Sequence, residues 1–500
     1  MARKPGTGRS VRRAGKPAKA SARPANGKKS VAGKKSVTAA PRPRVEQLTN
    51  TLSAVPRAGA LPPPRKAVNA GVIRSKHKEF LFPCVANYYE EPVVLTEGKG
   101  CFATDADGRE YLDFFGGILT LGLGHAHPEV VGRVSDQISR LGHTSSLYAT
   151  EPVVNVAEKL AKIAPGKLKK SFFTASGTEA NETAILVAKL FTGRQEIIAL
   201  RFGYSGRSLT ALSLGGNANW RLIPTQMTGV KHALAPYCYR CPLGLTYPSC
   251  EIKCAQDMDE LIRTETNGQP AAFIAEPIAG VGGFITPPRE YFQIAVGIVR
   301  KYGGIFICDE VQTGFGRTGD HWFGIEHWGV EPDVMTMAKS IASGFSVGAT
   351  IAREEVANAF TGLTISTFGG SPITMSATEA TLDVMKRENT PKRSAERGKQ
   401  MREGLLAMKD AYPMIGDVRG MGLMQGIELV EDRKTKAPSP KGANRLLEAA
   451  KKEGLLIGKG GHYGNVIRMA PSMLITKAEM AEALKRLDRA CARAQSEMSS

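Results

Sequence analysis

Short apolar runs that stop at an ionisable residue recur three times in the middle of the chain. The runs are residues 271–275, 305–308 and 334–338, and the residues that follow them are Glu276, Asp309 and Lys339. Runs this short, rich in β-branched and aromatic side chains, are typical of buried strands in a parallel sheet. Each strand is therefore expected to end at an acid or a lysine.

The spacing between these three residues supports the same architecture. Asp309 follows Glu276 by 33 residues, and Lys339 follows Asp309 by 30. Each interval is the length of one strand–helix–strand crossover. The three side chains are then expected at the carboxyl ends of successive strands, where open α/β sheets bind ligands.

Further periodic segments extend the pattern in both directions. They predict strands at 93–95, 100–104, 111–114, 170–174, 197–200, 349–351 and 422–429, and helices after Pro128, at 153–163 and 179–190, from Ser376, and at 395–410, 443–453 and 477–494. We expect an α/β fold with a mostly parallel central sheet flanked by helices, plus a smaller α+β domain from the two chain ends. The expected parts are a tail (1–75), an N-terminal segment joining the small domain (76–125), a large domain (126–380) and the C-terminal small domain (381–500).

The net charge of +20 belongs mainly to the tail. Residues 1–66 hold 17 Lys or Arg and one acid, a net of +16, which leaves +4 for the rest of the chain. The tail has too few large apolar residues to offset its ordering entropy, so disorder is expected to about residue 75. Three interpretations of the tail are open: a solvated extension, a segment that binds polyanions weakly, or an organellar transit peptide. The frequent Pro and Gly disfavour the amphipathic helix of a transit peptide. No run is long enough to span a bilayer.

A lysine and an acid at neighbouring strand ends suit one cofactor in particular. Pyridoxal 5'-phosphate needs a lysine for its Schiff base and a carboxylate that keeps its ring nitrogen protonated. Lys339 and Asp309 fit these roles. The competing interpretation is a pair of ordinary solvated strand ends.

The segment after the strand at 170–174 is typical of a phosphate site. Ser176, Gly177 and Thr178 lead from that strand into the helix at 179–190, so free N–H groups and two hydroxyls would face one anion. The hydroxyls are equally compatible with simple helix caps. At the end of the next strand, Tyr204 would stack on a flat cofactor ring or pack in the core.

Four of the eight cysteines lie close together. Cys238 and Cys241 have metal-ligand spacing, and Cys250 and Cys254 are near it. A structural zinc or iron–sulfur site competes with the preferred alternative, reduced thiols in a long loop. No catalytic metal is expected.

Several separated motifs occur in an order that resembles the class-III, or ω-amino-acid, aminotransferases of pyridoxal-phosphate fold type I. They are residues 108–113 (GREYLD), 124–128 (GHAHP), 176–182 (SGTEANE), 276–278 (EPI), 309–319 (DEVQTGFGRTG), 338–339 (AK) and 366–370 (STFGG). The resemblance covers residues from about 80 to 490. It is closest to the alanine–glyoxylate, β-alanine–pyruvate and 4-aminobutyrate members.

The resemblance implies a role for each matching residue. Lys339 would hold the cofactor aldehyde and shuttle a proton, Asp309 would pair with the ring nitrogen, Gln312 would approach the phenolic oxygen, Tyr204 would stack on the ring, and Gly177 and Thr178 would bind the phosphate. Thr367 would reach the phosphate of a neighbouring subunit, which implies a homodimer or a dimer of dimers. Arg468 would grip the α-carboxylate, and Glu276 would pair with Arg468 when an ω-amine enters.

The predicted function is a ping-pong transamination. The donor would be β-alanine, 4-aminobutyrate or alanine, and the acceptor pyruvate, glyoxylate or 2-oxoglutarate. Alternatives are another pyridoxal-phosphate reaction, such as decarboxylation or aminomutation, and a non-catalytic regulator that binds nucleic acid through its tail. The predicted location is cytoplasmic, or the mitochondrial matrix if the N-terminus is a transit peptide.

Overall fold

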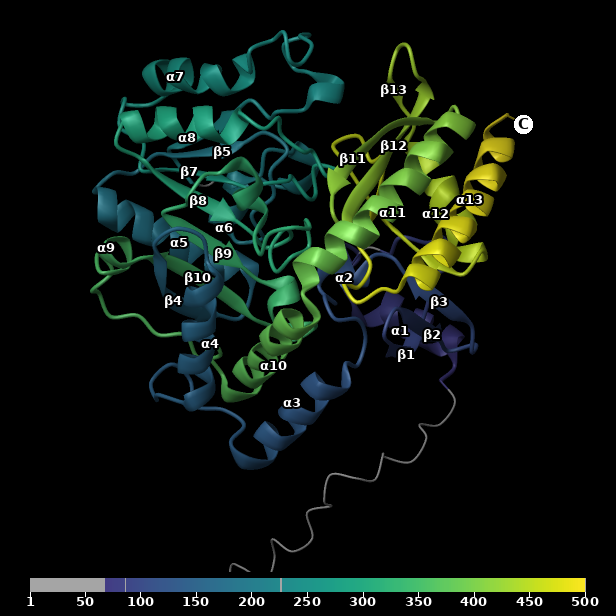
Figure 1. The fold of residues 1–500 in the computed structure, drawn as a ribbon, viewed down its shortest axis with the longest axis horizontal. Coiled ribbons are helices and arrows are strands. Elements are labelled where there is room, and N and C mark those ends of the chain that lie inside the picture. The colour runs from purple at the N-terminus through teal and green to yellow at the C-terminus, as the bar shows by residue number, and fades with distance from the viewer. Residues whose placement is uncertain (1–67, 86, 225–226, 500) are drawn as a thin grey trace, which may run out of the picture. The chain divides into compact units, whose positions relative to one another are not determined.

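The computed structural model describes residues 68–85, 87–224 and 227–499. A seven-stranded sheet lies at the centre of the larger part (Figure 1), in the order β4-β10-β9-β8-β7-β5-β6. Its strands are β4 (Leu168–Thr174), β5 (Ile197–Leu200), β6 (Val230–Ala233), β7 (Ala272–Ala275), β8 (Ile305–Asp309), β9 (Val334–Met337) and β10 (Gly348–Arg353). Only β10 runs antiparallel to its neighbours. The predicted α/β class with a mostly parallel sheet is confirmed.

The three strands predicted first are adjacent in the sheet. β7 pairs with β8 and β8 with β9, both in parallel, and every residue of the three strands is buried. Their apolar runs are continuous because helices cover both faces of the sheet. The carboxyl ends of β7, β8 and β9 therefore meet at one edge.

Helices surround this sheet (Figure 1). α7 (Lys253–Glu265) packs against α8 (Tyr291–Lys301), and α5 (Gly177–Thr192) packs against β8, β9 and β10. The remaining helices of this part are α3 (Pro128–Arg140), α4 (Glu151–Ile163), α6 (Leu209–Leu214), α9 (Glu354–Ala357) and α10 (Pro372–Glu388). Helix α10 runs without a break across the domain boundary expected at residue 380.

A second, antiparallel sheet is formed by the C-terminal part of the chain. It contains β11 (Ile415–Met421), β12 (Met424–Asp432), β16 (Val466–Met469) and β15 (Gly458–Gly460), with β13 (Ala437–Pro438) beside β12. Helices α11 (Thr390–Ala411), α12 (Pro440–Lys452) and α13 (Lys477–Ser499) accompany it. The prediction of one strand over 422–429 is wrong in its start. Gly422, with a φ of 51°, belongs to the turn between β11 and β12, and β11 was not predicted.

Both ends of the described chain contribute to a third sheet. β1 (Leu95–Lys99), β2 (Phe102–Asp105) and β3 (Glu110–Asp113) form an antiparallel meander, and β14 (Leu455–Leu456) pairs in parallel with β3. The short helix α2 (Gly116–Leu119) follows β3. One continuous apolar core includes Leu112 of β3, Phe306 of β8 and Ile427 of β12, so it extends through all three sheets.

Helix α1 (Ala70–Phe80) corrects the predicted extent of the disordered tail. Its first turn is capped by Asn69, whose side-chain oxygen accepts a hydrogen bond from the N–H of Val72 at 3.1 Å. A capped helix therefore begins before residue 75. The rest of the predicted tail, residues 1–67, lies outside the described residues. In the part of the chain that is described, no helix combines the length and apolarity needed to cross a membrane.

Candidate active site

Lys339, Asp309 and Glu276 converge at the edge where β9, β8 and β7 end. They line one cavity of about 330 Å³ together with five other predicted site residues, namely Ser176, Gly177, Thr178, Tyr204 and Gln312. Burial lowers the pKa of Lys339, and the charges of Asp309 and Glu276 oppose that shift. A buried lysine of lowered pKa that lines a cavity is suited to react with a carbonyl group.

Asp309 is held by a buried amide that was not among the predicted site residues. Asn181 Nδ2 donates to Asp309 Oδ2 at 2.8 Å and lies 2.9 Å from the carbonyl oxygen of Ser205. Its own oxygen accepts from the hydroxyl of Thr336 at 2.7 Å. Burial raises the pKa of Asp309, while the bonds from Asn181 and from the N–H of Val311 lower it. The amide therefore favours the ionised carboxylate.

The place of Asn181 at the site could have been predicted from the sequence. It lies on helix α5, four residues after Gly177, so both face the same side of the helix. That side faces the cavity and the end of β8. Helical spacing from a predicted phosphate site was the available signal.

The start of α5 has the geometry expected of an anion site. Ser176 caps the helix by accepting from the N–H of Glu179 at 3.3 Å, so the capping alternative holds for this hydroxyl. Thr178 Oγ1 accepts from the N–H of Arg207 at 3.3 Å. A Cβ at Gly206 would lie 2.3 Å from that same hydroxyl oxygen. The N–H groups of Gly177 and Thr178, which precede that of Glu179, have no intrahelical partner and remain for an anion.

Tyr204 and Gln312 complete the walls of the cavity. The Tyr204 ring meets Trp220 edge-on at 5.5 Å, and the N–H of Tyr204 donates to Glu276 at 3.0 Å. Gln312 is buried, and its Oε1 is without a hydrogen-bond partner in the described part of the chain. An unpartnered amide oxygen facing the cavity indicates room for a polar ligand.

Glu276 and Arg468 do not form an ion pair in this structure, and the pairing that the resemblance implies for entry of an ω-amine stays a prediction. Glu276 accepts from the N–H of Gly280 at 2.8 Å, whereas Arg468 Nη1 donates to the carbonyl oxygen of Gly280 at 3.3 Å. The backbone of Gly280 therefore lies between the two side chains. Burial, and then the charge of Asp309, raises the pKa of Glu276 to about 8.

Arg468 is almost fully buried but has no ion-pair partner among the described residues. It is 4% exposed, and its guanidinium lies 5.1 Å from the ring centre of Phe115 and 5.8 Å from that of Phe284. It donates to the carbonyl oxygen of Lys459 at 3.0 Å. Its Nε finds no acceptor within the described chain. Nη2 also lies 3.5 Å from the hydroxyl of Tyr88. A buried guanidinium held by carbonyls, rings and a hydroxyl, but by no acid among the described residues, keeps N–H groups available for a carboxylate.

One predicted residue lies apart from this cavity, and one residue that was not predicted lines it. Thr367 is exposed on a loop and does not line the cavity, and its neighbour Phe368 is 66% exposed. Arg207, which was not among the predicted site residues, lines the cavity mouth and is exposed. No spacing along the chain distinguishes Arg207 from an ordinary surface arginine.

The four clustered cysteines do not supply a metal centre. Cys238 is exposed, whereas Cys241, Cys250 and Cys254 are partly buried, and all four are free thiols. Over residues 68–85, 87–224 and 227–499, no group of three or more His, Cys, Asp or Glu could hold a metal ion. The zinc or iron–sulfur alternative is therefore not supported.

The donors around the cavity fit pyridoxal phosphate. A lysine of lowered pKa, a buried carboxylate that accepts a hydrogen bond from an amide, a helix N-terminus and a Gln312 oxygen without a partner among the described residues surround one cavity. These are the groups that an aldehyde, a ring nitrogen and a phosphate require.

Comparison with known proteins agrees with this geometry. The family model for class-III aminotransferases matches residues 84–491. "Alanine–glyoxylate aminotransferase 2 homolog 2, mitochondrial" of Arabidopsis thaliana is 43% identical over 417 residues, 83% of this chain and 86% of that protein. A leucine/methionine racemase of Thermococcus litoralis is 34% identical over 82% of this chain and 93% of its own length.

A solved structure extends the agreement to three dimensions. The amine transaminase of an uncultivated Pseudomonas species, crystallised in its PLP-bound form, superposes with a TM-score of 0.79 at 30% identity. The match covers 86% of this chain and 100% of that one. The chain therefore belongs to the class-III aminotransferase family and is a pyridoxal-phosphate enzyme of fold type I that transfers amino groups between amino acids and oxo acids.

Proposed function

We propose that the enzyme takes its amino group from alanine or a short ω-amino acid, such as β-alanine or 4-aminobutyrate, and gives it to glyoxylate or pyruvate. 2-Oxoglutarate is the alternative acceptor. The observation that carries this proposal is Arg468, a buried guanidinium with no ion-pair partner among the described residues. Burying an unpaired charge costs several kcal/mol, of order 3–5 in proteins, unless a ligand supplies the opposite charge. The α-carboxylate of an amino or oxo acid is such a ligand.

The roles of the chain's own residues follow from their positions. Bound pyridoxal phosphate supplies an electron sink for the carbon that carries nitrogen. Asp309, whose pKa is lowered by the hydrogen bond from Asn181 against the effect of burial, would hold a proton on the ring nitrogen. The amine of Lys339, with its lowered pKa, moves a proton at the substrate carbon. Arg468 binds the carboxylate of the substrate and so orients it. Glu276 becomes a negative counter-charge for Arg468 when Glu276 loses its proton.

The choice of substrates rests on the relatives. The Arabidopsis protein carries alanine and glyoxylate in its name, which places this pair first in a substrate screen. The racemase of Thermococcus litoralis represents a second candidate function. In racemisation the proton leaves and returns at the same carbon, and no nitrogen reaches an oxo acid.

We also propose that the active unit is a homodimer. Thr367 is exposed and lies outside the cavity that holds Lys339, so it is free to serve the phosphate of a second subunit. Leu363 and Ile365 on the same loop are 101% and 57% exposed, respectively, and such apolar side chains are candidates for burial at an interface. Sedimentation of wild type and Thr367→Ala, with cofactor binding measured on both, tests this assignment.

The location and the tail remain predictions. We infer a cytoplasmic enzyme, with the mitochondrial matrix as the alternative that the Arabidopsis relative's name suggests. Weak polyanion binding is a property to be sought in residues 1–67, which lie outside the described part of the chain.

The test is a panel of donors and acceptors with purified full-length enzyme. Alanine, β-alanine, 4-aminobutyrate and ornithine are paired with glyoxylate, pyruvate and 2-oxoglutarate, and new amino acid and oxo acid are both measured. We expect turnover with alanine and glyoxylate. Loss of optical activity in alanine, without any transfer of nitrogen, would replace transamination by racemisation.

Two variants connect the panel to the site. Lys339→Ala is expected to abolish turnover, whereas Lys189→Ala is expected to leave it unchanged, because burial also lowers the pKa of Lys189 but this lysine lies outside the cavity. Arg468→Met should raise the Michaelis constant for glyoxylate and pyruvate by about 30-fold or more, the scale of losing one partner of a buried charge pair. Unchanged acceptor kinetics in Arg468→Met would contradict the carboxylate role.

A further inference from the structure

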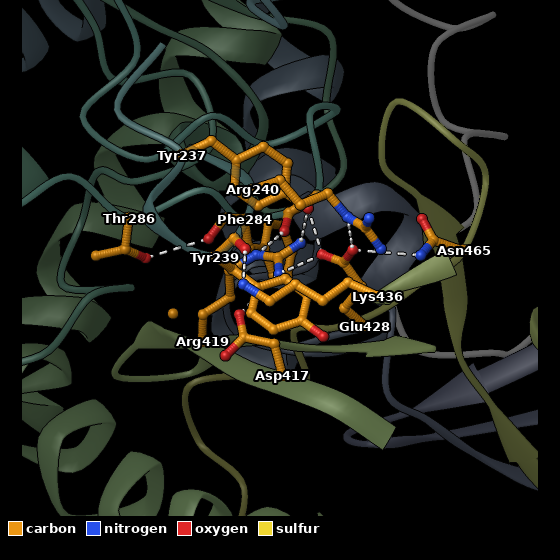
Figure 2. A network of polar contacts seen from close by, with 12 residues as sticks. Tyr237, Tyr239, Arg240, Phe284, Thr286, Asp417, Arg419, Glu428, Lys436 and Asn465 are labelled. Carbon is orange, nitrogen blue, oxygen red and sulfur yellow. Dashed lines mark hydrogen bonds and ion pairs between the residues drawn. The ribbon is translucent and has the colours of Figure 1, made fainter. Parts of the chain in front are cut away.

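A buried network of charged and aromatic side chains lies behind the substrate arginine, outside the cavity (Figure 2). Its centre is Arg419 on β11, with Glu428 on β12 and Tyr237 from the loop after β6. We propose that Arg419 is a positioning residue that fixes the turn at residues 279–285 and thereby sets the relative placement of Glu276 and Arg468. This inference rests on the proposed function, in which those two residues receive the substrate.

The turn connects the two substrate residues through a single glycine. The N–H of Gly280 donates to Glu276 at 2.8 Å, and its carbonyl oxygen accepts from Arg468 at 3.3 Å. A shift of Gly280 would therefore move a hydrogen-bond partner of both side chains at once. A Cβ at Gly280 would lie 2.3 Å from the side chain of Gln312, so the backbone here is also closely packed against the cavity wall.

Backbone hydrogen bonds close the turn, and Arg419 binds it from outside in addition to Arg468. The N–H of Ala279 donates to Ile285 at 3.0 Å, and the N–H of Gly283 donates to Gly280 at 3.2 Å. Arg419 Nε donates to the carbonyl oxygen of Gly283 at 2.7 Å. This is a short, charge-assisted bond from the second sheet to the turn.

Arg419 is itself unable to swing away. It is 8% exposed, and its Nη1 donates to Glu428 at 2.6 Å and to Asp417 at 2.9 Å. Its Nη2 lies 3.2 Å from the hydroxyl of Tyr237, and the guanidinium lies 5.0 Å from the centre of that ring. Figure 2 shows these groups gathered around the guanidinium. Every nitrogen of Arg419 is thus engaged, and Nε alone serves the turn.

Glu428 anchors the network as a charged group. It is fully buried, and it also accepts from Arg240 Nε at 2.5 Å and from Asn465 at 3.3 Å. Burial raises its pKa, but the charge of Arg419 and the bonds from Tyr237 and Arg240 outweigh that effect and lower it. The pair is therefore ionised at neutral pH, and the direction of Arg419 is fixed by an opposite charge.

A change at Arg419 should weaken acceptor recognition without removing any group of the cavity. In Arg419→Lys the ammonium keeps a charge for Glu428 but, as a point charge on a flexible stem, cannot also hold Gly283 in the geometry of a planar guanidinium. The KM for glyoxylate or pyruvate is expected to rise about tenfold, which corresponds to about 1.4 kcal/mol. The kcat is expected to stay within about threefold of the wild-type value, and the cofactor absorbance is expected not to change. Neither Lys339 nor Asp309 contacts the network.

The experiment compares five proteins in steady-state kinetics: wild type, Arg419→Lys, Glu428→Gln, Lys436→Met and the double variant Arg419→Lys/Arg468→Met. Lys436→Met is the matched control, because Lys436 contacts Tyr239 in the same network but not the turn; its acceptor KM should not change. In the Arg468→Met background, Arg419→Lys should have no further effect, since the residue it positions is absent.

The outcomes separate this proposal from the proposed function. If wild type aminates none of the oxo acids, the proposed function fails, whatever Arg419 does. If wild type is active but Arg419→Lys shows an unchanged acceptor KM, or an equal loss in the Arg468→Met background, only the positioning role is overturned. If Arg419→Lys does not fold, Glu428→Gln provides the test. This variant keeps the bond from Arg419 to Gly283 but removes the charge that holds Arg419 in place. An acceptor KM equal to that of wild type in Glu428→Gln would also overturn the proposal.

Discussion

Replacing Asn181 by leucine tests how far its amide lowers the pKa of the buried Asp309. Leucine has nearly the shape of asparagine, but it removes the amide that donates to Asp309 at 2.8 Å. It also leaves the hydroxyl of Thr336 and the carbonyl of Ser205 without that amide. Asp309 is only 4% exposed, so water cannot easily replace the lost donor.

The size of the effect follows from the kind of bond. A hydrogen bond to a charged group contributes about 1.5–3 kcal/mol, which is about one to two pKa units for Asp309. Burial already raises the pKa of Asp309, and the loss of Asn181 raises it further. Because the cofactor ring nitrogen binds the ionised acid, Asn181→Leu should weaken cofactor binding by about 10-fold to 150-fold.

Equilibrium dialysis of the apoprotein against pyridoxal phosphate measures this affinity directly. Thr336→Val removes only the hydroxyl that orients the amide, and it should weaken binding by about 2-fold to 10-fold, the range for a neutral hydrogen bond. Thr183→Val is the control, because Thr183 lies on the same helix and bonds Glu179 instead. If Asn181→Leu binds the cofactor within about threefold of wild type, Asp309 does not depend on this amide and the reasoning is wrong.

Two more predictions concern groups beside Asp309. The pKa of Glu276 is raised from 4.5 to about 8, so the folded state holds a proton that the unfolded chain releases above pH 4.5. The unfolding free energy of the apoprotein should therefore fall as pH rises between these values, by up to about 1.4 kcal/mol per pH unit from this group. In urea unfolding, the free energy of Glu276→Gln should depend less steeply on pH than that of wild type. Equal pH dependence in the two proteins would contradict the raised pKa. Gly280→Ala would place a methyl group 2.3 Å from the side chain of Gln312, so that side chain must move. Cofactor affinity should fall in Gly280→Ala but not further in Gln312→Ala/Gly280→Ala, and an equal fall in both backgrounds would show that the backbone, not Gln312, is displaced.

The predicted site residues whose meeting at one cavity follows from the sequence are those placed by local patterns. Asp309 and Lys339 follow apolar runs that end in the same sheet, so strand order and crossover length suffice to bring them together. Ser176, Gly177 and Thr178 lie at the junction of a strand and a helix, which is equally local. Because β8 and β9 are adjacent and parallel, no knowledge of the loops was needed for this half of the site.

The parts that the sequence did not reveal depend on contacts between distant segments. Glu276 and Arg468 are 192 positions apart in the chain, and their relation is set by the carbonyl and N–H of one glycine, which no side-chain pattern encodes. Arg419 belongs to β11, a strand that was not predicted, and it reaches a backbone oxygen outside its own sheet. Backbone acceptors are the same at every residue, so sequence alone cannot identify which one an arginine will bind.

Buried arginines that donate to backbone carbonyls also connect the two larger sheets. Arg317, which is fully buried, donates from its loop after β8 to the carbonyls of Leu423 and Pro471, at 3.3 and 2.5 Å. Arg419 donates in the opposite direction, from β11 to Gly283. Burial lowers the pKa of Arg317 to about 10, so it stays charged at neutral pH, and its carbonyl acceptors do not titrate. The contacts that align the substrate arginine with the cofactor cavity are therefore insensitive to pH over the neutral range, and pH effects on turnover should arise from Glu276, Asp309 and Lys339 inside the cavity.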